Sequence, residues 1–98
     1  MTKLEEYKSR LKSEIIELTR RLNVVSGDYH VIARDNLALQ IDGTFRANTL
    51  SPTTVSSSGA AQTLAEAAGF DIEKLDVVDL PTYFTRVLKS KRALLEAA

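Results

Sequence analysis

The sequence predicts a single α+β domain spanning residues 1–98, and three observations support this fold class. An apolar stripe at helical spacing runs through residues 3–23. A segment of alternating apolar and polar residues follows at 29–49 and contains two turn signals. Two more helical segments follow at 58–68 and 81–96. Separate runs of helix and strand, without repeated strand–helix units, are typical of α+β domains.

The first helix is predicted over residues 3–23. Spacings of three and four residues place one apolar stripe along a single face of this helix. The stripe consists of Leu4, Tyr7, Leu11, Ile15, Leu18 and Leu22. It extends over about three heptads, the lower limit for a coiled coil. It therefore fits either self-association, with a dimer as the first expectation, or packing onto the sheet of the same chain.

The charged faces of this helix contain two pairs of opposite charge four residues apart. Glu6 precedes Arg10, and Glu17 precedes Arg21. Both pairs have the favourable order for an ion pair on a helix, with the acidic residue first.

A three-stranded antiparallel meander is predicted over residues 29–49, with strands at 29–34, 36–41 and 44–49. Two three-residue loops, 34–36 and 41–43, connect these strands and place Asn36 and Gly43 in the left-handed region. This register pairs Ala33 with Leu37, Val31 with Leu39, Leu39 with Phe45 and Leu37 with Ala47. One apolar face results, and a one-residue slip would expose it. The opposite, outer face would carry His30, Ile32, Ala38, Gln40, Arg46 and Asn48.

The second half of the chain begins with a polar connector at 50–57, which leads into the helix at 58–68. The serines at 56–58 are suited to capping its start, and Gly69 followed by Phe70 to ending it. Residues 74–79 fit either a fourth strand or an extended linker. Asp79 and Pro81 mark the start of the last helix, 81–96. We expect the two C-terminal helices to cover the apolar face of the meander.

Composition excludes several classes of site. The chain has no cysteine, which excludes disulfides and thiolate metal sites and fits a cytoplasmic protein. A single histidine, His30, excludes multi-histidine metal sites, so we expect no metal and no cofactor. The charged start is not expected to be a signal peptide, and no apolar run approaches the roughly 20 residues of a membrane-spanning helix. Thirteen basic and thirteen acidic residues cancel, so no overall field attracts nucleic acid or lipid.

No motif of a catalytic or nucleotide-binding site is present, so we do not expect an enzyme. The nearest arrangement is Asp28 with His30, two residues apart on one strand, which could activate a serine of residues 56–58. A polar pair on the exposed face of a strand explains the same residues more simply.

These features favour a non-enzymatic protein-binding or regulatory module that occupies a surface of a partner and self-associates. In size, charge balance and α+β makeup, the chain is similar to small accessory proteins of phages and mobile elements, such as inhibitors of host systems. The expected contact residues come from the helical stripe and the outer sheet face: Leu4, Tyr7, Leu11, Ile15, Leu18, Leu22, His30, Ile32, Gln40 and Arg46.

The alternative function is nucleic-acid binding through the last helix. Its positive charges could contact phosphates: Arg86, Lys89, Lys91 and Arg92. No base-stacking aromatic residues are interleaved with them, so a solvated helix face explains the same pattern.

Overall fold

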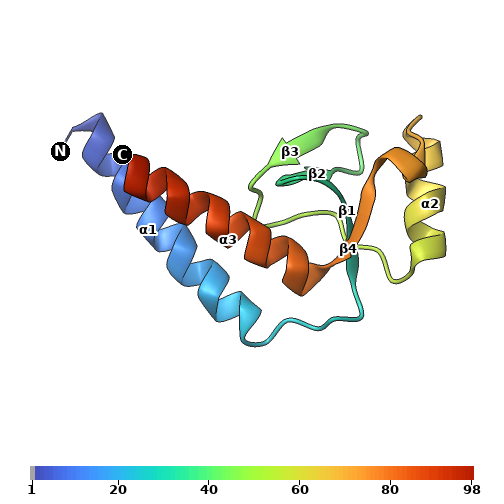
Figure 1. The fold of residues 1–98 in the computed structure, drawn as a ribbon, viewed down its shortest axis with the longest axis horizontal. Helices are drawn as coiled ribbons and strands as arrows, with labels where there is room; N and C mark the ends of the chain where they lie inside the picture. The colour runs from blue at the N-terminus through green and yellow to red at the C-terminus, as the bar shows by residue number, and fades with distance from the viewer. Residues whose placement is uncertain (1) are drawn as a thin grey trace.

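A four-stranded antiparallel sheet and three α-helices make up residues 2–98, the part of the chain that the computed structural model describes (Figure 1). The elements follow in the order α1 (Lys3–Leu22), β1 (His30–Arg34), β2 (Leu37–Leu39), β3 (Phe45–Ala47), α2 (Ser58–Ala67), η1 (Ile72–Lys74), β4 (Asp76–Asp79) and α3 (Leu80–Ala97), where η1 is a short 3-10 helix. The predicted α+β class is confirmed, and the segment 74–79 contains a strand.

The sheet forms the middle layer between two layers of helix. Its strand order is β3-β2-β1-β4. Helices α1 and α3 lie side by side and antiparallel, and their free ends extend past the sheet (Figure 1). Their side of the sheet is filled by Leu18, Val31, Ala33, Ala38, Tyr83, Phe84, Val87 and Leu88. The side under α2 is filled by Ile32, Leu39, Ala61 and Ala65. The two C-terminal helices therefore cover opposite faces, and the prediction that both cover one face is wrong.

The hairpin between β2 and β3 has the predicted register. Leu39 lies opposite Phe45, and Leu37 lies opposite Ala47. The loop closes with a 2.7 Å hydrogen bond from the Gln40 N–H to the Thr44 carbonyl. Gly43 has φ +84, a left-handed conformation that glycine adopts without a steric cost. The three-residue loop is confirmed.

The hairpin between β1 and β2 differs from the prediction by one residue. Arg34 lies opposite Leu37 and Ala33 opposite Ala38, so the loop has two residues. Asp35, with φ 57, takes the left-handed position that was predicted for Asn36. The prediction assumed that only one face of the meander is buried. Strands covered on both faces are instead continuously apolar, and this explains the buried run at residues 31–33.

The predicted outer face of the sheet does not exist as one exposed surface. Because side chains alternate along a strand, His30 and Ile32 face α2, whereas Ala38 and Arg46 face the α1–α3 side. Ile32 is 1% exposed and Ala38 is fully buried. The grouping of these residues with Gln40 and Asn48 on an open face is therefore wrong.

The predicted capping residues of α2 and α3 are confirmed, and the helix bounds differ from the predicted ones by no more than one residue at each end. The Ser57 hydroxyl accepts a 3.1 Å hydrogen bond from the Ala60 N–H at the start of α2. The Asp79 carboxylate accepts a 2.7 Å hydrogen bond from the Thr82 N–H at the start of α3. Gly69 ends α2 with φ +85. These local signals fix where each helix begins or ends without reference to the rest of the fold.

The Ile32→Ala variant tests the observed register. We expect it to lower the free energy of unfolding by about 2–5 kcal/mol, because it leaves a cavity between the sheet and α2. Ile41→Ala is the matched control, since Ile41 is 80% exposed and its truncation should change stability by no more than about 0.5 kcal/mol. Urea denaturation measures both variants. Equal stabilities would contradict the burial of Ile32 beneath α2.

Asp79 makes the start of α3 sensitive to acid. Hydrogen bonds from the side chain and backbone of Thr82, with a smaller effect of His30, hold the pKa of Asp79 below its ordinary value of 3.8. The unfolded chain therefore binds this proton at a higher pH than the folded chain. The stabilisation is complete above the ordinary pKa and is lost as the pH falls through the lower, folded pKa.

The Asp79→Asn variant keeps a capping side chain but removes this titration. We expect the stability difference between wild type and variant to shrink as the pH falls from about 5 through the ordinary aspartate pKa and below it. Urea denaturation across this range measures the difference. A difference that stays constant with pH would show that Asp79 has the same pKa in both states.

Candidate functional site

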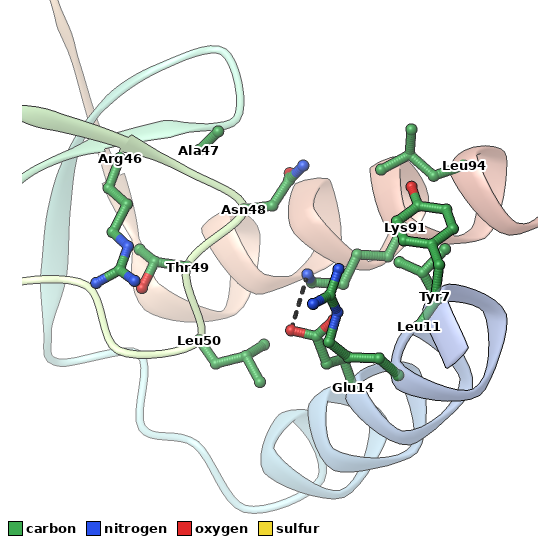
Figure 2. Close-up of a pocket in the computed structure, with 11 residues that line it drawn as sticks. Tyr7, Leu11, Glu14, Arg46, Ala47, Asn48, Thr49, Leu50, Lys91 and Leu94 are labelled. Atoms are coloured by element: carbon green, nitrogen blue, oxygen red, sulfur yellow. Dashed lines mark ion pairs between the residues drawn. The ribbon is translucent and has the colours of Figure 1, made fainter. Parts of the chain in front are cut away.

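A cleft of about 470 Å³ lies where the α1–α3 pair meets the end of β3 (Figure 2). Three segments that are distant in sequence form its walls. The lining residues are Tyr7, Arg10, Leu11 and Glu14 of α1, residues 46–50, and Lys91 and Leu94 of α3. The antiparallel packing of the first and last helices brings these side chains together.

A buried ion pair joins the two helices at the cleft. Lys91 Nζ lies 3.3 Å from Glu14 Oε2, and the dashed line in Figure 2 marks this pair. The Lys91 side chain is 7% exposed and the Glu14 side chain 29%. Because the ammonium is almost completely removed from water, it depends on the carboxylate for compensation. The pair contributes no net charge to the cleft.

Two arginines give the cleft its net positive charge. Arg10 lies on the α1 wall and Arg46 on the β3 wall, and both are exposed. Neither forms an ion pair with another residue of 2–98. The Arg10 guanidinium carbon lies 5.7 Å from the centroid of the Tyr7 ring. This cation–π contact stabilises the Arg10 guanidinium over the face of the Tyr7 ring. The predicted ion pair between Glu6 and Arg10 is not formed among residues 2–98.

The wall formed by residues 49 and 50 is attached to the core from behind. The Tyr83 hydroxyl donates a 3.0 Å hydrogen bond to the Thr49 carbonyl. The Arg21 guanidinium donates to the Leu50 carbonyl and to Glu17, the predicted helix pair. Burial raises the pKa of Tyr83 to about 12, so its hydroxyl remains a donor at neutral pH. These contacts place the wall relative to both helices.

The end of β3 turns sharply at the cleft. Asn48 has φ 50, a left-handed conformation that asparagine tolerates better than most residues. Its N–H donates to the Asn36 carbonyl at 2.9 Å, and its side-chain oxygen accepts from Asn36 Nδ2 at 2.8 Å. Asn36 therefore fixes this turn through two hydrogen bonds.

Comparison with protein-family models, curated proteins and solved structures finds no match for this chain. Across residues 2–98, no group of three or more His, Cys, Asp or Glu side chains is placed to hold a metal ion. In the same range, no helix has the length and apolar character needed to cross a membrane.

Four residues singled out in the sequence meet in the cleft. Tyr7, Leu11 and Arg46 were expected to contact a protein partner, and Lys91 was expected to contact nucleic acid. The structure thus joins members of two separate predictions into one site.

The other expected contact residues lie elsewhere. Leu18 and Ile32 are buried in the two cores, and Ile15 and Leu22 pack against the first of them. Leu4 is 53% exposed near the free end of α1.

His30 and Gln40 are partly buried outside the cleft. The backbone of His30 exchanges two 2.8 Å hydrogen bonds with Val55, but the ring atom Nδ1 is buried without a partner in residues 2–98. In this range no hydrogen bond joins the ring to a serine hydroxyl. The arrangement that would activate a serine is therefore not assembled.

The basic residues of α3 do not form one face. Lys91 points toward α1, whereas Arg86 lies 3.8 Å from Asp76 in a weak ion pair on another side of the helix. Lys89 and Arg92 remain exposed.

Sequence reasoning did not identify seven of the lining residues as contacts: Arg10, Glu14, residues 47–50 and Leu94. Arg10 and Glu14 flank the apolar stripe at helical spacing from Tyr7 and Leu11, so their position on that side of α1 could have been derived. Residues 48–50 carried no such signal, because the path of the chain after β3 depends on tertiary contacts.

The Glu14–Lys91 pair should respond asymmetrically to mutation. Glu14→Gln leaves a buried ammonium without a countercharge, and we expect it to cost about 1–3 kcal/mol of unfolding free energy. Lys91→Met keeps a side chain of similar length and leaves a carboxylate that can reach water, so it should cost less. Adding Glu14→Gln to Lys91→Met should then cost little more. Urea denaturation of the three variants measures this coupling, and a neutral Glu14→Gln would contradict it.

Proposed function

We propose that this protein is a non-enzymatic binding module whose cleft receives acidic side chains of a partner protein. The observation that carries the proposal is the pair of arginines, Arg10 and Arg46, on two walls of one concave site. Occupying an acidic surface of a partner is a mode of action suited to a small regulatory protein, such as an accessory protein of a phage or mobile element.

Carboxylates match the chemistry of the cleft. A guanidinium group offers planar, paired donors that fit a carboxylate and keep their charge at all physiological pH values. Because Lys91 is compensated by Glu14, the cleft has two positive charges that no residue of 2–98 compensates. The chain as a whole has no net charge. Attraction is therefore local to the cleft, which favours recognition of a matching site over general adhesion to polyanions.

A binding role fits the cleft better than catalysis or nucleic-acid recognition. The lining contains no histidine, and its one carboxylate, Glu14, is engaged by Lys91. Its one aromatic side chain, Tyr7, is occupied by Arg10. Nucleic-acid binding normally requires a longer basic surface with free aromatic rings for stacking. It remains the alternative, with Lys89 and Arg92 as its contacts.

Self-association is a separate proposal. Leu11 and Leu18 of the helical stripe are buried within the chain, so a dimer through the whole stripe would require α1 to leave α3. Leu4, in the first turn of α1, and Leu94, in the last turn of α3, are exposed apolar residues. Light scattering after size-exclusion chromatography would show whether they support a dimer.

Titration with a synthetic acidic peptide tests the cleft. The probe is a ten-residue peptide of alternating glutamate and serine, added to isotope-labelled protein at about 0.15 M salt, where charges more than about 8 Å away are largely screened. We expect amide shifts centred on the lining residues, because the peptide carboxylates approach the two guanidinium groups. Arg10→Ala with Arg46→Ala should weaken binding by about tenfold, the loss of two exposed charge contacts.

The matched control removes the same charge elsewhere. Lys89→Ala with Arg92→Ala should leave peptide affinity within about twofold, since these residues lie outside the cleft. Equal losses in the two double variants would overturn the proposal. Binding of a single-stranded oligonucleotide that depends on Lys89 and Arg92 would favour the alternative instead.

A further inference from the structure

We infer that the acidic segment binds as an extended strand along the outer edge of β3. This inference rests on the proposed function, and it adds the conformation and spacing of the segment. Strand addition supplies affinity through main-chain hydrogen bonds and specificity through alternate side chains.

The outer edge of β3 has free main-chain groups. Strand β3 is at the end of the sheet and pairs only with β2. The Thr44 carbonyl accepts a hydrogen bond from Gln40, and the Asn48 N–H donates one to Asn36, so both residues face inward. Main-chain direction alternates in an antiparallel pair. The N–H and C=O groups of Phe45 and Ala47 therefore point away from the sheet.

This edge borders the cleft. Arg46, Ala47 and Asn48 follow one another along the chain at the cleft wall (Figure 2). The Arg46 side chain projects toward the side of the sheet where α1 and α3 lie. The free ends of these helices extend past the sheet (Figure 1). A strand placed about 4.8 Å outside β3 would therefore run beside the wall of the cleft that residues 46–48 form.

Side-chain alternation then sets the sequence of the segment. Every second side chain of an added strand points to the same side as Arg46. Acidic residues at positions i and i+2 would approach Arg46 and the opposite wall with Arg10. The side chains between them would point to the other side, where Phe45 packs against Phe70.

Charge favours an acidic partner over a second copy of this chain. Pairing β3 with β3 of another molecule would bring two Arg46 side chains close together, and like charges on neighbouring strands are destabilising. The edge is also only three residues long and ends at the turn of Asn48. Short, charged edges of this kind resist self-pairing. The carboxylates of an acidic segment would instead be attracted to Arg46 at this edge.

Amide hydrogen exchange in the presence of the glutamate–serine peptide tests the inference. We expect exchange at the Phe45 and Ala47 N–H groups to slow by at least about tenfold at saturation, because both gain acceptors. Val77 is the matched control. Its N–H faces outward from β4, the opposite edge, since the Leu80 N–H bonds inward to the Tyr29 carbonyl. Its exchange should not change.

A modified peptide provides the second readout. Methylation of the peptide nitrogens at alternate positions removes donors without changing charge, and one of the two methylation registers should weaken binding by at least about tenfold. Peptide binding that needs Arg10 and Arg46 but leaves Phe45 and Ala47 unprotected would overturn strand addition and leave the proposed function standing. If the peptide did not bind, both the strand addition and the proposed function would be overturned. If protection of the Phe45 and Ala47 N–H groups rose with protein concentration in the absence of peptide, the occupant of the edge would be a second copy of this chain. The inference of an acidic strand would then be overturned.

Discussion

Strand β1 buries side chains on both of its faces, and the arrangement of the other elements depends on this constraint. Val31 and Ala33 pack beneath α1 and α3, while Ile32 packs beneath α2. A strand covered on one side would alternate apolar and polar residues, whereas this one is continuously apolar. The two-residue loop at 35–36 sets the register in which Ala33 lies opposite Ala38. In this register Ile32 and Leu39 lie on the same face of the sheet, beneath α2. Two layers of helix become necessary, and the sheet lies between them.

The cleft wall depends on the core because one fully buried side chain belongs to both. Tyr83 packs in the core between the sheet and α3, and its hydroxyl reaches the Thr49 carbonyl. Burying a hydroxyl without a partner would be costly, so this hydrogen bond restrains the segment after β3. Arg21 restrains the next carbonyl, that of Leu50, from α1. The wall carrying Arg46 is therefore adjacent to backbone that is fixed to both long helices.

Local signals in the sequence predicted the helices and one hairpin, because capping residues and a left-handed glycine act within a few positions. Gly43 is such a case, and Asp79 is another. The other hairpin was mispredicted because Asp35 and Asn36 can both adopt positive φ, and the choice between them depends on α2, which covers the far face. The cleft was only partly predictable. Tyr7 and Lys91 were identified separately, but their meeting requires the antiparallel pairing of the first and last helices.

A buried Lys91 is expensive in desolvation, and an apolar side chain would stabilise the helix pair at lower cost. Its pairing with Glu14 instead fixes one relative position of α1 and α3, because the charges are satisfied only when the two side chains meet. Arg10 lies one helical turn before Glu14, so the same pairing sets where its guanidinium stands relative to Arg46. The neutral pair and the free arginines then have different roles: the pair defines the geometry of the cleft, and the arginines provide its attraction. Arg46 also disfavours pairing of β3 with another copy, so a single charge at the sheet edge both repels the wrong occupant and attracts an acidic one.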